Sequence, residues 1–441
     1  MANTWPINPR RHDGYRRATC GHSAEEARAV AKLAINGGPR TIDRQIGKSW
    51  PIHGETERAN LLEVLESGHW WRGGEAEASM VARFEQGFAA FQDAKYGVAI
   101  TNGTQAIECA LKAIGVKPGD EVICPAATFV ATATACILVN AIPIVVDIDP
   151  ANYQISPAAI EAAITERTVG IIPVHYGGYP VDMASIREIA SRHGLWIIED
   201  AAHAHGSTWN GQGCGSLSDI GCFSLQMGKT LTAGEGGVCL TNDEALAEKL
   251  FSFHHIGRFA GRPFYEHHIV ASNLRMTEWQ AAVALGGLER LEEQAETRNR
   301  NTLYFEKGLR EIEGVSPIER DDWVTRWNFY FYHFKFHSEQ FGGISRQRFA
   351  EALGAEGLGI GSGHLHPIQK NPLFTERNWG PACFGDNEPP DYLSIQTPEC
   401  DRIAAEEGCS LTHRLFLGGT EDMDLMLEAI AKVRENVAEL G

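Results

Sequence analysis

The feature that most constrains the fold is an alternation of short apolar runs and helical segments between residues 97 and 241. Apolar runs that predict strands lie at 97–101, 121–124, 142–147, 168–174, 195–198, 220–225 and 238–241. Helical patterns separate most of these runs, for example at 106–114 and 182–193. Such an alternation is typical of an α/β fold in which helices cover both faces of a largely parallel sheet.

The remaining sequence suggests further parts on either side of this sheet. With 441 residues the chain is long enough for two or three domains. We expect an N-terminal arm at 1–56, a large domain at 57–300, and a smaller α+β domain at 301–441. Strands are predicted at 327–336 and 358–362, and helices at 346–356 and 421–439. A long helix from residue 279 to about residue 301 would bridge the two domains.

Charge and cysteine usage limit the partners and the compartment. The net charge of −18 argues against non-specific binding to nucleic acids or to anionic membranes. No run of eighteen apolar residues is present, and the first nineteen residues are polar, which does not fit a secretion signal. The ten cysteines include no Cys-x-x-Cys pair, so we expect reduced thiols in a cytoplasmic protein.

The chemistry is expected where two strands end. Asp200 stands at the end of the strand at 195–198, and Lys229 follows the strand at 220–225 in a turn bordered by glycines. A lysine amine can form an imine with an aldehyde cofactor once burial lowers its pKa. A buried carboxylate can keep a pyridine nitrogen protonated. These residues suit pyridoxal phosphate, although a single lysine is more often a surface charge and a single aspartate a helix cap.

A phosphate site and a ring-stacking residue are candidates upstream. The strand at 97–101 leads into Asn-Gly-Thr-Gln at 102–105 and then a helix, a geometry that can cradle an anion. An ordinary strand-to-helix turn would look the same. Phe129 could stack on a flat cofactor ring or lie in the core.

Two pairs of alternating histidines could be read as metal ligands. They are His203 with His205, and His364 with His366. Neither pair has a carboxylate or a cysteine at ligand spacing, so we expect no metal site.

Five motifs in order resemble the DegT/DnrJ/StrS aminotransferases, a family of pyridoxal-phosphate enzymes that act on keto-sugars and keto-cyclitols. The motifs are Thr-Asn-Gly-Thr-Gln-Ala at 101–106, Thr-Phe-Val-Ala-Thr at 128–132, Glu-Asp-Ala-Ala-His-Ala-His-Gly at 199–206, Phe-Ser-Leu-Gln-Met-Gly-Lys at 223–229 with Gly-Glu-Gly-Gly at 234–237, and Ser-Asn-Leu-Arg-Met at 272–276. The resemblance implies the aspartate-aminotransferase fold, with a mostly parallel seven-stranded sheet and a smaller C-terminal domain.

The resemblance also implies roles for individual residues. Lys229 would hold the cofactor covalently and move protons, and Asp200 would pair with the ring nitrogen. The other cofactor contacts would be His203 near the ring 3-hydroxyl, Phe129 on the ring face, and Gly103, Thr104, Ser224 and Gln226 at the phosphate, with Gln226 alternatively facing the substrate. Asn273 would reach the cofactor phosphate of a neighbouring subunit, which implies a homodimer with shared active sites. Trp71, His175 and His413 would line the substrate side.

Three runs resemble one branch of the family most closely. They are Gly-His-Trp-Trp-Arg at 68–72, the run at 223–229, and Leu-Thr-His-Arg at 411–414. That branch contains glutamine-dependent inosose aminotransferases and aminohydroxybenzoate synthases of antibiotic biosynthesis. The expected reaction is therefore transfer of an amino group from L-glutamine or L-glutamate to a cyclic ketone, an inosose or a keto-sugar. A lyase of the aminohydroxybenzoate-synthase type, a sugar-nucleotide aminotransferase and a non-catalytic protein with the same fold are the alternatives.

Overall fold

The computed structural model describes residues 32–72 and 79–441, and its central element is a seven-stranded sheet. The strand order is β1-β9-β8-β5-β4-β2-β3. The strands are β1 (Tyr96–Ile100), β2 (Glu121–Pro125), β3 (Ile142–Val146), β4 (Thr168–Ile171), β5 (Trp196–Asp200), β8 (Ile220–Ser224) and β9 (Gly237–Thr241). Only β9 runs antiparallel to its neighbours, β1 and β8. The predicted mostly parallel sheet of seven strands is therefore confirmed.

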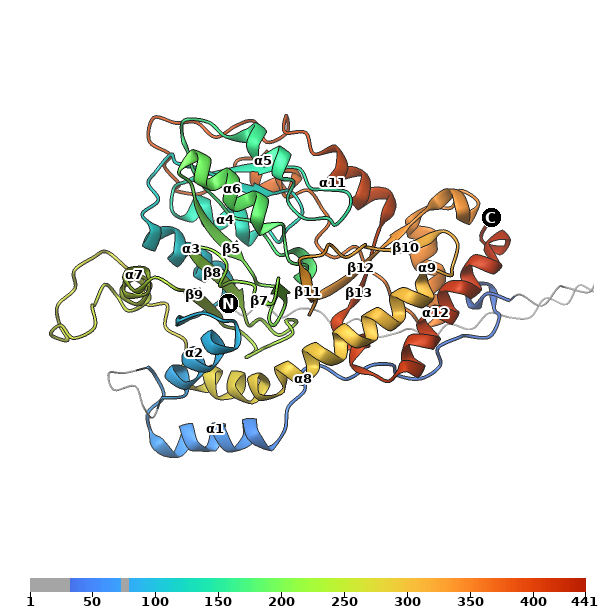
Figure 1. The fold of residues 1–441 in the computed structure, drawn as a ribbon, viewed down its shortest axis with the longest axis horizontal. Coiled ribbons are helices and arrows are strands. Elements are labelled where there is room, and N and C mark those ends of the chain that lie inside the picture. The colour runs from blue at the N-terminus through green and yellow to red at the C-terminus, as the bar shows by residue number, and fades with distance from the viewer. Residues whose placement is uncertain (1–31, 73–78) are drawn as a thin grey trace, which may run out of the picture.

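Helices cover both faces of this sheet (Figure 1). Successive strand residues point to opposite faces, so Ile197 packs among residues of one helical layer and Ile198 among those of the other. The first layer contains α2 (Met80–Phe91), α5 (Pro157–Ala163), α6 (Met183–His193) and the start of α8 (Glu278–Leu309). The second contains α3 (Gly103–Ile114), α4 (Ala131–Leu138) and α7 (Glu244–His254). Helix α1 (Glu55–Ser67) packs along α8.

Helix α8 connects the sheet to the C-terminal part of the chain. Its 32 residues extend for about 48 Å at 1.5 Å per residue. Its early residues, such as Leu291, belong to the core beneath the large sheet, whereas Phe305 and Leu309 belong to the core of the C-terminal part. The predicted bridging helix is present and extends eight residues beyond the 301 that the sequence pattern suggested.

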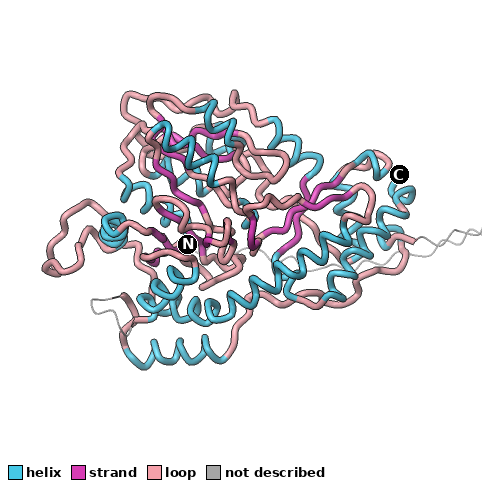
Figure 2. The backbone as a smooth tube through the Cα atoms, in the orientation of Figure 1, coloured by secondary structure: helices cyan, strands magenta, loops and turns pink. Residues whose placement is uncertain are grey.

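A three-stranded antiparallel sheet forms the centre of the C-terminal part (Figure 2). It consists of β10 (Val315–Pro317), β12 (Phe331–Phe336) and β13 (Gly408–Thr412), and it packs with α9 (Arg346–Glu356) and α12 (Thr420–Glu435). The strand predicted at 358–362 is wrong. Only Gly361 pairs there, in a single bridge to Ser410, because the surrounding glycines leave few side chains to pack. Strands β10 and β13 were not predicted.

Short elements complete the described chain. A small sheet joins β6 (Thr208–Trp209) and β7 (Gln212–Gly213) to β11 (Val324–Arg326) of the C-terminal part. The short helices are η1 (Ala34–Asn36), η2 (Tyr176–Gly178), η3 (Ser338–Phe341), η4 (Ile368–Lys370), α10 (Pro372–Thr375), α11 (Pro398–Arg402), η5 (Ile403–Glu407), η6 (His413–Leu417) and η7 (Val437–Leu440). No helix within the described ranges is both long and apolar enough to span a membrane.

The described part of the N-terminal arm lies against the C-terminal part of the chain. Leu33, Ile42 and Ile46 are buried in its core. The Ile42 amide donates a hydrogen bond to the carbonyl of Glu356 at 2.8 Å, and the Gly47 amide donates one to Asp422 Oδ2 at 2.9 Å. The nine described cysteines are free thiols, and Cys20 lies outside the described residues. The domain boundaries at 56 and 300 stay a prediction.

Candidate active site

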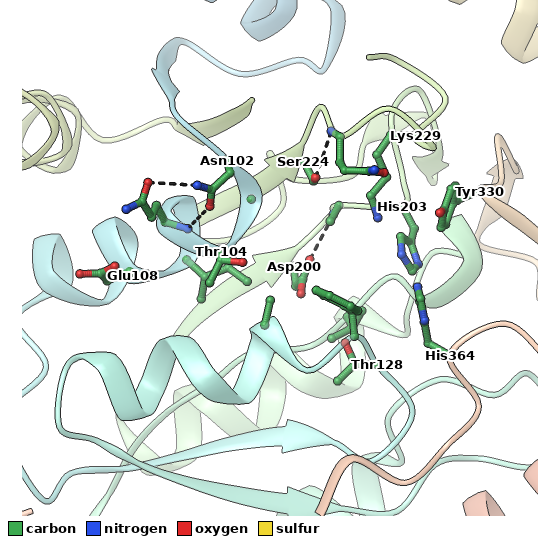
Figure 3. Close-up of a pocket in the computed structure, with 18 of the residues that line it drawn as sticks. Asn102, Thr104, Glu108, Thr128, Asp200, His203, Ser224, Lys229, Tyr330 and His364 are labelled. Atoms are coloured by element: carbon green, nitrogen blue, oxygen red, sulfur yellow. Dashed lines mark hydrogen bonds between the residues drawn. The ribbon is translucent and has the colours of Figure 1, made fainter. Parts of the chain in front are cut away.

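A cavity of about 890 Å³ lies where the carboxyl ends of β1, β5 and β8 meet. Parallel sheets bind ligands at this edge because successive strands deliver their loops to the same place. Residues between 102 and 235 provide most of the lining, and the C-terminal part of the chain adds Tyr330 and His364. In Figure 3, Asn102 and Thr104 lie on one side of Asp200, and His203, Tyr330 and His364 lie on the other.

Lys229 brings a buried amine into this cavity. Only 8% of the residue is exposed, and its Nζ lies 4.3 Å from the centroid of the Tyr330 ring. Burial lowers the pKa of Lys229 to about 8, and the negative charge of Asp200 opposes that shift. About a tenth of the amine is therefore unprotonated at pH 7, far more than in an ordinary lysine, and the unprotonated amine is the nucleophilic form.

Asp200, the last residue of β5, is held by two donors. Thr132 Oγ1 donates a hydrogen bond to Oδ2 at 2.7 Å, and the Ala202 amide donates one to Oδ1 at 3.2 Å. Burial raises the pKa of Asp200, while the Thr132 hydrogen bond, the Ala202 amide and Lys229 lower it. The carboxyl group of Asp200 is therefore fixed and desolvated, and a cationic partner in the cavity would stabilise its charged form.

His203 faces the cavity as a neutral hydrogen-bond donor. Its Nδ1 accepts a hydrogen bond from the Gly177 amide at 3.2 Å, so the proton of the neutral ring is on Nε2. Burial, followed by the charge of Lys229, lowers the pKa of His203 well below its usual value. The ring packs against Tyr330 with 4.7 Å between centroids, which fixes its orientation.

The first turn of α3 closes one end of the cavity with backbone donors. Asn102 caps this helix by accepting a hydrogen bond from the Gln105 amide at 2.9 Å. The amides of residues 103 and 104 lie in the same turn, where helix geometry provides no intrahelical acceptor. Gly103 is required because a Cβ there would lie 2.7 Å from the Cβ of Ser224. Ser224 therefore packs directly against the turn, and the two segments together form an anion cradle.

The structure also places two further predicted contacts on the cavity wall. Phe129 lines the cavity with 51% of its surface exposed, although an apolar side chain of this size is usually buried. Gln226 lines it too, and its Oε1 accepts a hydrogen bond from the Gly228 amide at 2.8 Å. An exposed aromatic side chain in the cavity that also holds the buried amine of Lys229 suits a flat cofactor ring.

Three predicted substrate residues and Asn273 do not line this cavity. His175 is fully buried, and its Nε2 lies 2.8 Å from Glu199 Oε2, because the neighbouring Val174 takes the cavity-facing position in the extended chain. Trp71 is half exposed and stacks on His255 with 6.4 Å between centroids. Asn273 is exposed and pairs through its backbone with His255. The prediction that His175 lines the substrate side does not fit this position.

His413 lies behind the turn that carries Lys229. Arg298 donates a hydrogen bond to its Nδ1 at 3.1 Å, so Nε2 carries the proton and donates to the carbonyl of Gly228, also at 3.1 Å. Trp50 Nε1 donates to the adjacent carbonyl of Met227 at 2.9 Å. His413 therefore supports the backbone next to Lys229 and does not contact the cavity.

Several cavity residues were not predicted. Tyr330 and His364 come from segments more than 100 positions beyond Lys229, where no local pattern signals a site. Thr132 does not line the cavity but donates a hydrogen bond to Asp200, which does, and its hydroxyl oxygen lies 2.7 Å from that of Thr128. It is the last residue of the motif at 128–132, although no role for it was predicted. Within the described ranges, no group of three or more His, Cys, Asp or Glu side chains could hold a metal ion.

Comparison with known proteins agrees with this geometry. The model of the DegT/DnrJ/EryC1/StrS aminotransferase family matches residues 51–384. A protein from Streptoalloteichus tenebrarius with the provisional name L-glutamine:3-amino-2,3-dideoxy-scyllo-inosose aminotransferase is 38% identical over 419 residues, covering 93% of this chain and all of the relative. The 3-amino-5-hydroxybenzoate synthase of Amycolatopsis mediterranei is 36% identical over 389 residues, covering 87% and 96% of the two chains.

Solved structures share the fold as well. The crystal structure of 3-amino-5-hydroxybenzoic acid synthase superposes with a TM-score of 0.79 at 35% identity, covering 89% of this chain and 99% of the other. An aminotransferase from Psychrobacter cryohalolentis gives a TM-score of 0.79 at 28% identity, covering 89% and all of the two chains. The residues matched by the family model include all of those that line the cavity. The chain therefore belongs to the DegT/DnrJ/EryC1/StrS aminotransferase family.

Proposed function

We propose that this aminotransferase uses pyridoxal phosphate to move the amino group of L-glutamine onto a cyclic ketone of the inosose class. The observation that carries the proposal is the meeting of Lys229 and Asp200 in one cavity, with the anion cradle of α3 at its end. An amine of lowered pKa, a buried carboxyl group and a phosphate site form the set that pyridoxal phosphate needs.

Each part of the cofactor has a counterpart among the cavity residues. The amides of Gly103 and Thr104 and the hydroxyl of Ser224 would hold the phosphate at the α3 terminus. Phe129 would cover the ring, and His203 Nε2 would donate a hydrogen bond to the ring hydroxyl. The cavity of about 890 Å³ has room for the cofactor and a small ring substrate together.

The chain's own residues would divide the chemistry between them. When bound, the cofactor supplies a cationic ring that accepts the electron pair released at the carbon bearing the amino group. Asp200 holds the positive charge on the ring nitrogen, and Thr132 and Ala202 keep its carboxylate oriented. Lys229 Nζ would take the proton from the amino-bearing carbon of the donor and pass it to the cofactor, and would move a proton in the reverse sense for the acceptor. Its pKa of about 8 suits both directions near neutral pH.

The cavity's charge supports a small uncharged acceptor. Among the described residues that line it, Lys229 is the only lysine or arginine, whereas Glu108, Asp200 and Glu235 are acidic. A nucleotide-linked sugar would bring a diphosphate into this surrounding in addition to the cofactor phosphate. The relatives named for inosose aminotransferases act, by those names, on a carbocyclic ketone with glutamine as donor. This combination favours the cyclitol reaction over the sugar-nucleotide one.

The similarity to 3-amino-5-hydroxybenzoate synthase supports a second candidate function. That relative is 36% identical to this chain, close to the value for the inosose aminotransferases. The same lysine and aspartate would then serve a lyase that aromatises a ring by loss of water. Products distinguish the two reactions, because only the aminotransferase adds nitrogen to its acceptor.

We also propose that two copies of the chain share their active sites. Asn273 is exposed, pairs through its backbone with His255, on which Trp71 stacks, and does not line this chain's own cavity. A partner copy related by a two-fold axis would place the residue at the other copy's phosphate site. In this arrangement Trp71 would also lie at the interface between the two subunits. A cytoplasmic location remains a prediction from the sequence.

Replacement of the lysine tests the proposal directly. Lys229→Ala should remove the yellow absorbance of the lysine-bound cofactor and lower kcat at least about a thousandfold. Lys249→Ala, which changes an exposed lysine of α7, is the matched control and should behave like the native protein. A Lys229→Ala protein that keeps both the absorbance and the turnover would refute the proposal.

A further inference from the structure

His364 belongs to the loop between α9 and η4 and lines the cavity from the C-terminal part of the chain. Figure 3 shows its ring beside His203, on the side of Asp200 away from Asn102 and Thr104. The phosphate cradle therefore lies at one end of the cavity and His364 at the other. A substrate next to the cofactor ring would meet His364 and not the cradle.

The backbone of this loop is held firmly around His364. The His364 amide donates a hydrogen bond to Tyr176 Oη at 2.8 Å. Gly361 exchanges two backbone hydrogen bonds with Ser410, at 2.8 and 2.9 Å. Gly363 has φ +60°, and a Cβ there would lie 2.7 Å from Tyr176 Oη, so only glycine allows the loop to come this close. These contacts fix the position from which the His364 side chain enters the cavity.

Aromatic neighbours hold the imidazole ring without using its nitrogens. The centroid of His364 lies 5.4 Å from that of Phe129, 5.6 Å from that of His203 and 5.2 Å from that of Phe331. The His203 ring is nearly parallel to it, at 25°. Neither ring nitrogen of His364 has a hydrogen-bond partner among the residues that the structure describes, although the ring is only partly exposed.

The charge state of the ring decides what it can bind. Burial, together with the nearby charge of Lys229, lowers the pKa of His364 to about 4. The neutral ring offers one N–H donor and one nitrogen acceptor. A hydroxyl group, which can both donate and accept, matches either nitrogen, whereas a carboxylate or phosphate would match only one.

We propose that His364 binds a ring hydroxyl of the cyclic acceptor and thereby positions its carbonyl carbon beside Lys229. Tyr330 links the two residues, since its ring centroid lies 4.3 Å from Lys229 Nζ and 6.4 Å from the His364 centroid. The proposal rests on the proposed function, because it assigns a residue to the acceptor of that reaction. Glutamine, the donor, has no ring hydroxyl and would not need this contact.

Two substitutions separate hydrogen bonding from packing. His364→Phe keeps an aromatic ring against Phe129 and Phe331 and removes both nitrogens, whereas His364→Asn keeps a donor and an acceptor. His366→Phe is the matched control, since His366 is exposed on the same loop. With scyllo-inosose as acceptor, His364→Phe should raise KM about tenfold, with kcat and the glutamine half-reaction little changed. His364→Asn should stay within about threefold of the native KM, and His366→Phe should match the native protein.

A binding measurement provides a readout independent of turnover. The reduced cyclitol scyllo-inositol has no carbonyl and cannot be aminated. Its Kd for the cofactor-loaded protein, measured by calorimetry, should rise about tenfold in His364→Phe and stay unchanged in His366→Phe. Thermal unfolding of each variant shows whether it is folded. If His364→Phe is not, the apolar variant His364→Leu replaces it, and if His364→Asn is not, His364→Gln replaces that one.

The outcomes distinguish this inference from the proposed function. If the native protein aminates scyllo-inosose and His364→Phe leaves both KM and Kd unchanged, the role of His364 is refuted and the proposed function stands. An equal KM increase in His364→Phe and His364→Asn would also overturn it, because packing would then explain the effect. If the native protein transfers no amino group to any cyclic ketone, both proposals fall together.

Discussion

Thr132 Oγ1 donates a hydrogen bond to Asp200 Oδ2 at 2.7 Å, across the 68 positions that separate the two residues in the sequence. Thr132 is in the first turn of α4, and Asp200 ends β5. The hydroxyl of Thr128 lies 2.7 Å from that of Thr132 and extends the chain of hydrogen bonds. The carboxyl group proposed to face the cofactor ring nitrogen is thus held by a buried side chain and not by solvent.

Thr132→Val should weaken cofactor binding. Valine has nearly the same shape but no hydroxyl, so Asp200 Oδ2 loses a buried donor and the pKa of Asp200 rises further. A hydrogen bond to a charged group contributes about 1.5–3 kcal/mol, which predicts a cofactor Kd at least about tenfold higher in an absorbance titration. Thr134→Val is the control, since Thr134 Oγ1 donates only to the carbonyl of Ala131, at 3.3 Å on the same helix. Equal affinities in the two variants would contradict the account.

Gly103→Ala should disrupt the anion cradle. The added methyl group would lie 2.7 Å from Ser224 Cβ and 3.3 Å from its Cα, so the first turn of α3 and the end of β8 must separate. We expect the Kd of pyridoxal phosphate to rise by about a hundredfold, because the groups that donate hydrogen bonds to the phosphate would be misplaced. Gly354→Ala, in α9, has nothing within 4 Å of the added Cβ and should leave binding unchanged. Native affinity in Gly103→Ala would show that this turn does not hold the phosphate.

The sequence pattern was sufficient to predict the large sheet. Each strand of that sheet is a short apolar run between turn signals. Because helices bury both faces of the sheet, most positions in these strands are apolar, and such runs are easy to recognise in the sequence. The C-terminal sheet was harder to predict because its edge strand β10 has three residues and β13 follows directly after a short helix. The false strand at 358–362 has apolar residues at the right spacing but only one paired position.

The residues of the candidate site also divide into those that local sequence patterns indicate and those that only packing brings to the cavity. Lys229, Asp200 and Gly103 lie at or shortly after strand ends that the sequence pattern predicts. Because a parallel sheet brings the carboxyl ends of its strands to one edge, these residues could be expected to lie close together. Tyr330 and His364 reach the cavity only through packing of the C-terminal part, which no local pattern encodes. His413 was expected at the substrate and instead supports the carbonyl of Gly228, a difference that depends on a single side-chain direction.

The reactivity of Lys229 should depend on pH around 8. Burial lowers its pKa to about 8 from an ordinary value of 10.5, so the protonated fraction falls as the pH rises through 8. The rate at which the cofactor-free protein captures the aldehyde should therefore rise tenfold per pH unit below 8 and level off above it. Stopped-flow absorbance from pH 6 to 10 measures this rate. A rate that still rises tenfold per pH unit up to pH 10 would mean that the amine is solvated and that the structure of the cavity is wrong.

Mixing two inactive variants should restore activity if the active sites are shared between subunits. Lys229→Ala removes the amine, and Asn273→Asp would place a negative charge near the partner's phosphate. In a mixed dimer one site lacks both residues and the other has both. Random reassortment of equal amounts should therefore recover about a quarter of the native activity.

The controls for this experiment are the two unmixed proteins. Each should have less than about one hundredth of the native activity under the same refolding or exchange conditions. A mixture that stays inactive while mixed dimers are detected by native mass spectrometry would place Asn273 outside the shared site. Full activity of Asn273→Asp alone would lead to the same conclusion.

The most direct test of the central claim uses L-glutamine labelled with ¹⁵N at its α-amino group. The purified protein, loaded with pyridoxal phosphate, is incubated with this donor and with scyllo-inosose or 2-deoxy-scyllo-inosose, and the products are analysed by mass spectrometry. The account predicts an aminocyclitol that carries the label, and no labelled product from Lys229→Ala. An unlabelled ketone recovered intact, or a ring product that has lost water without gaining nitrogen, would contradict it.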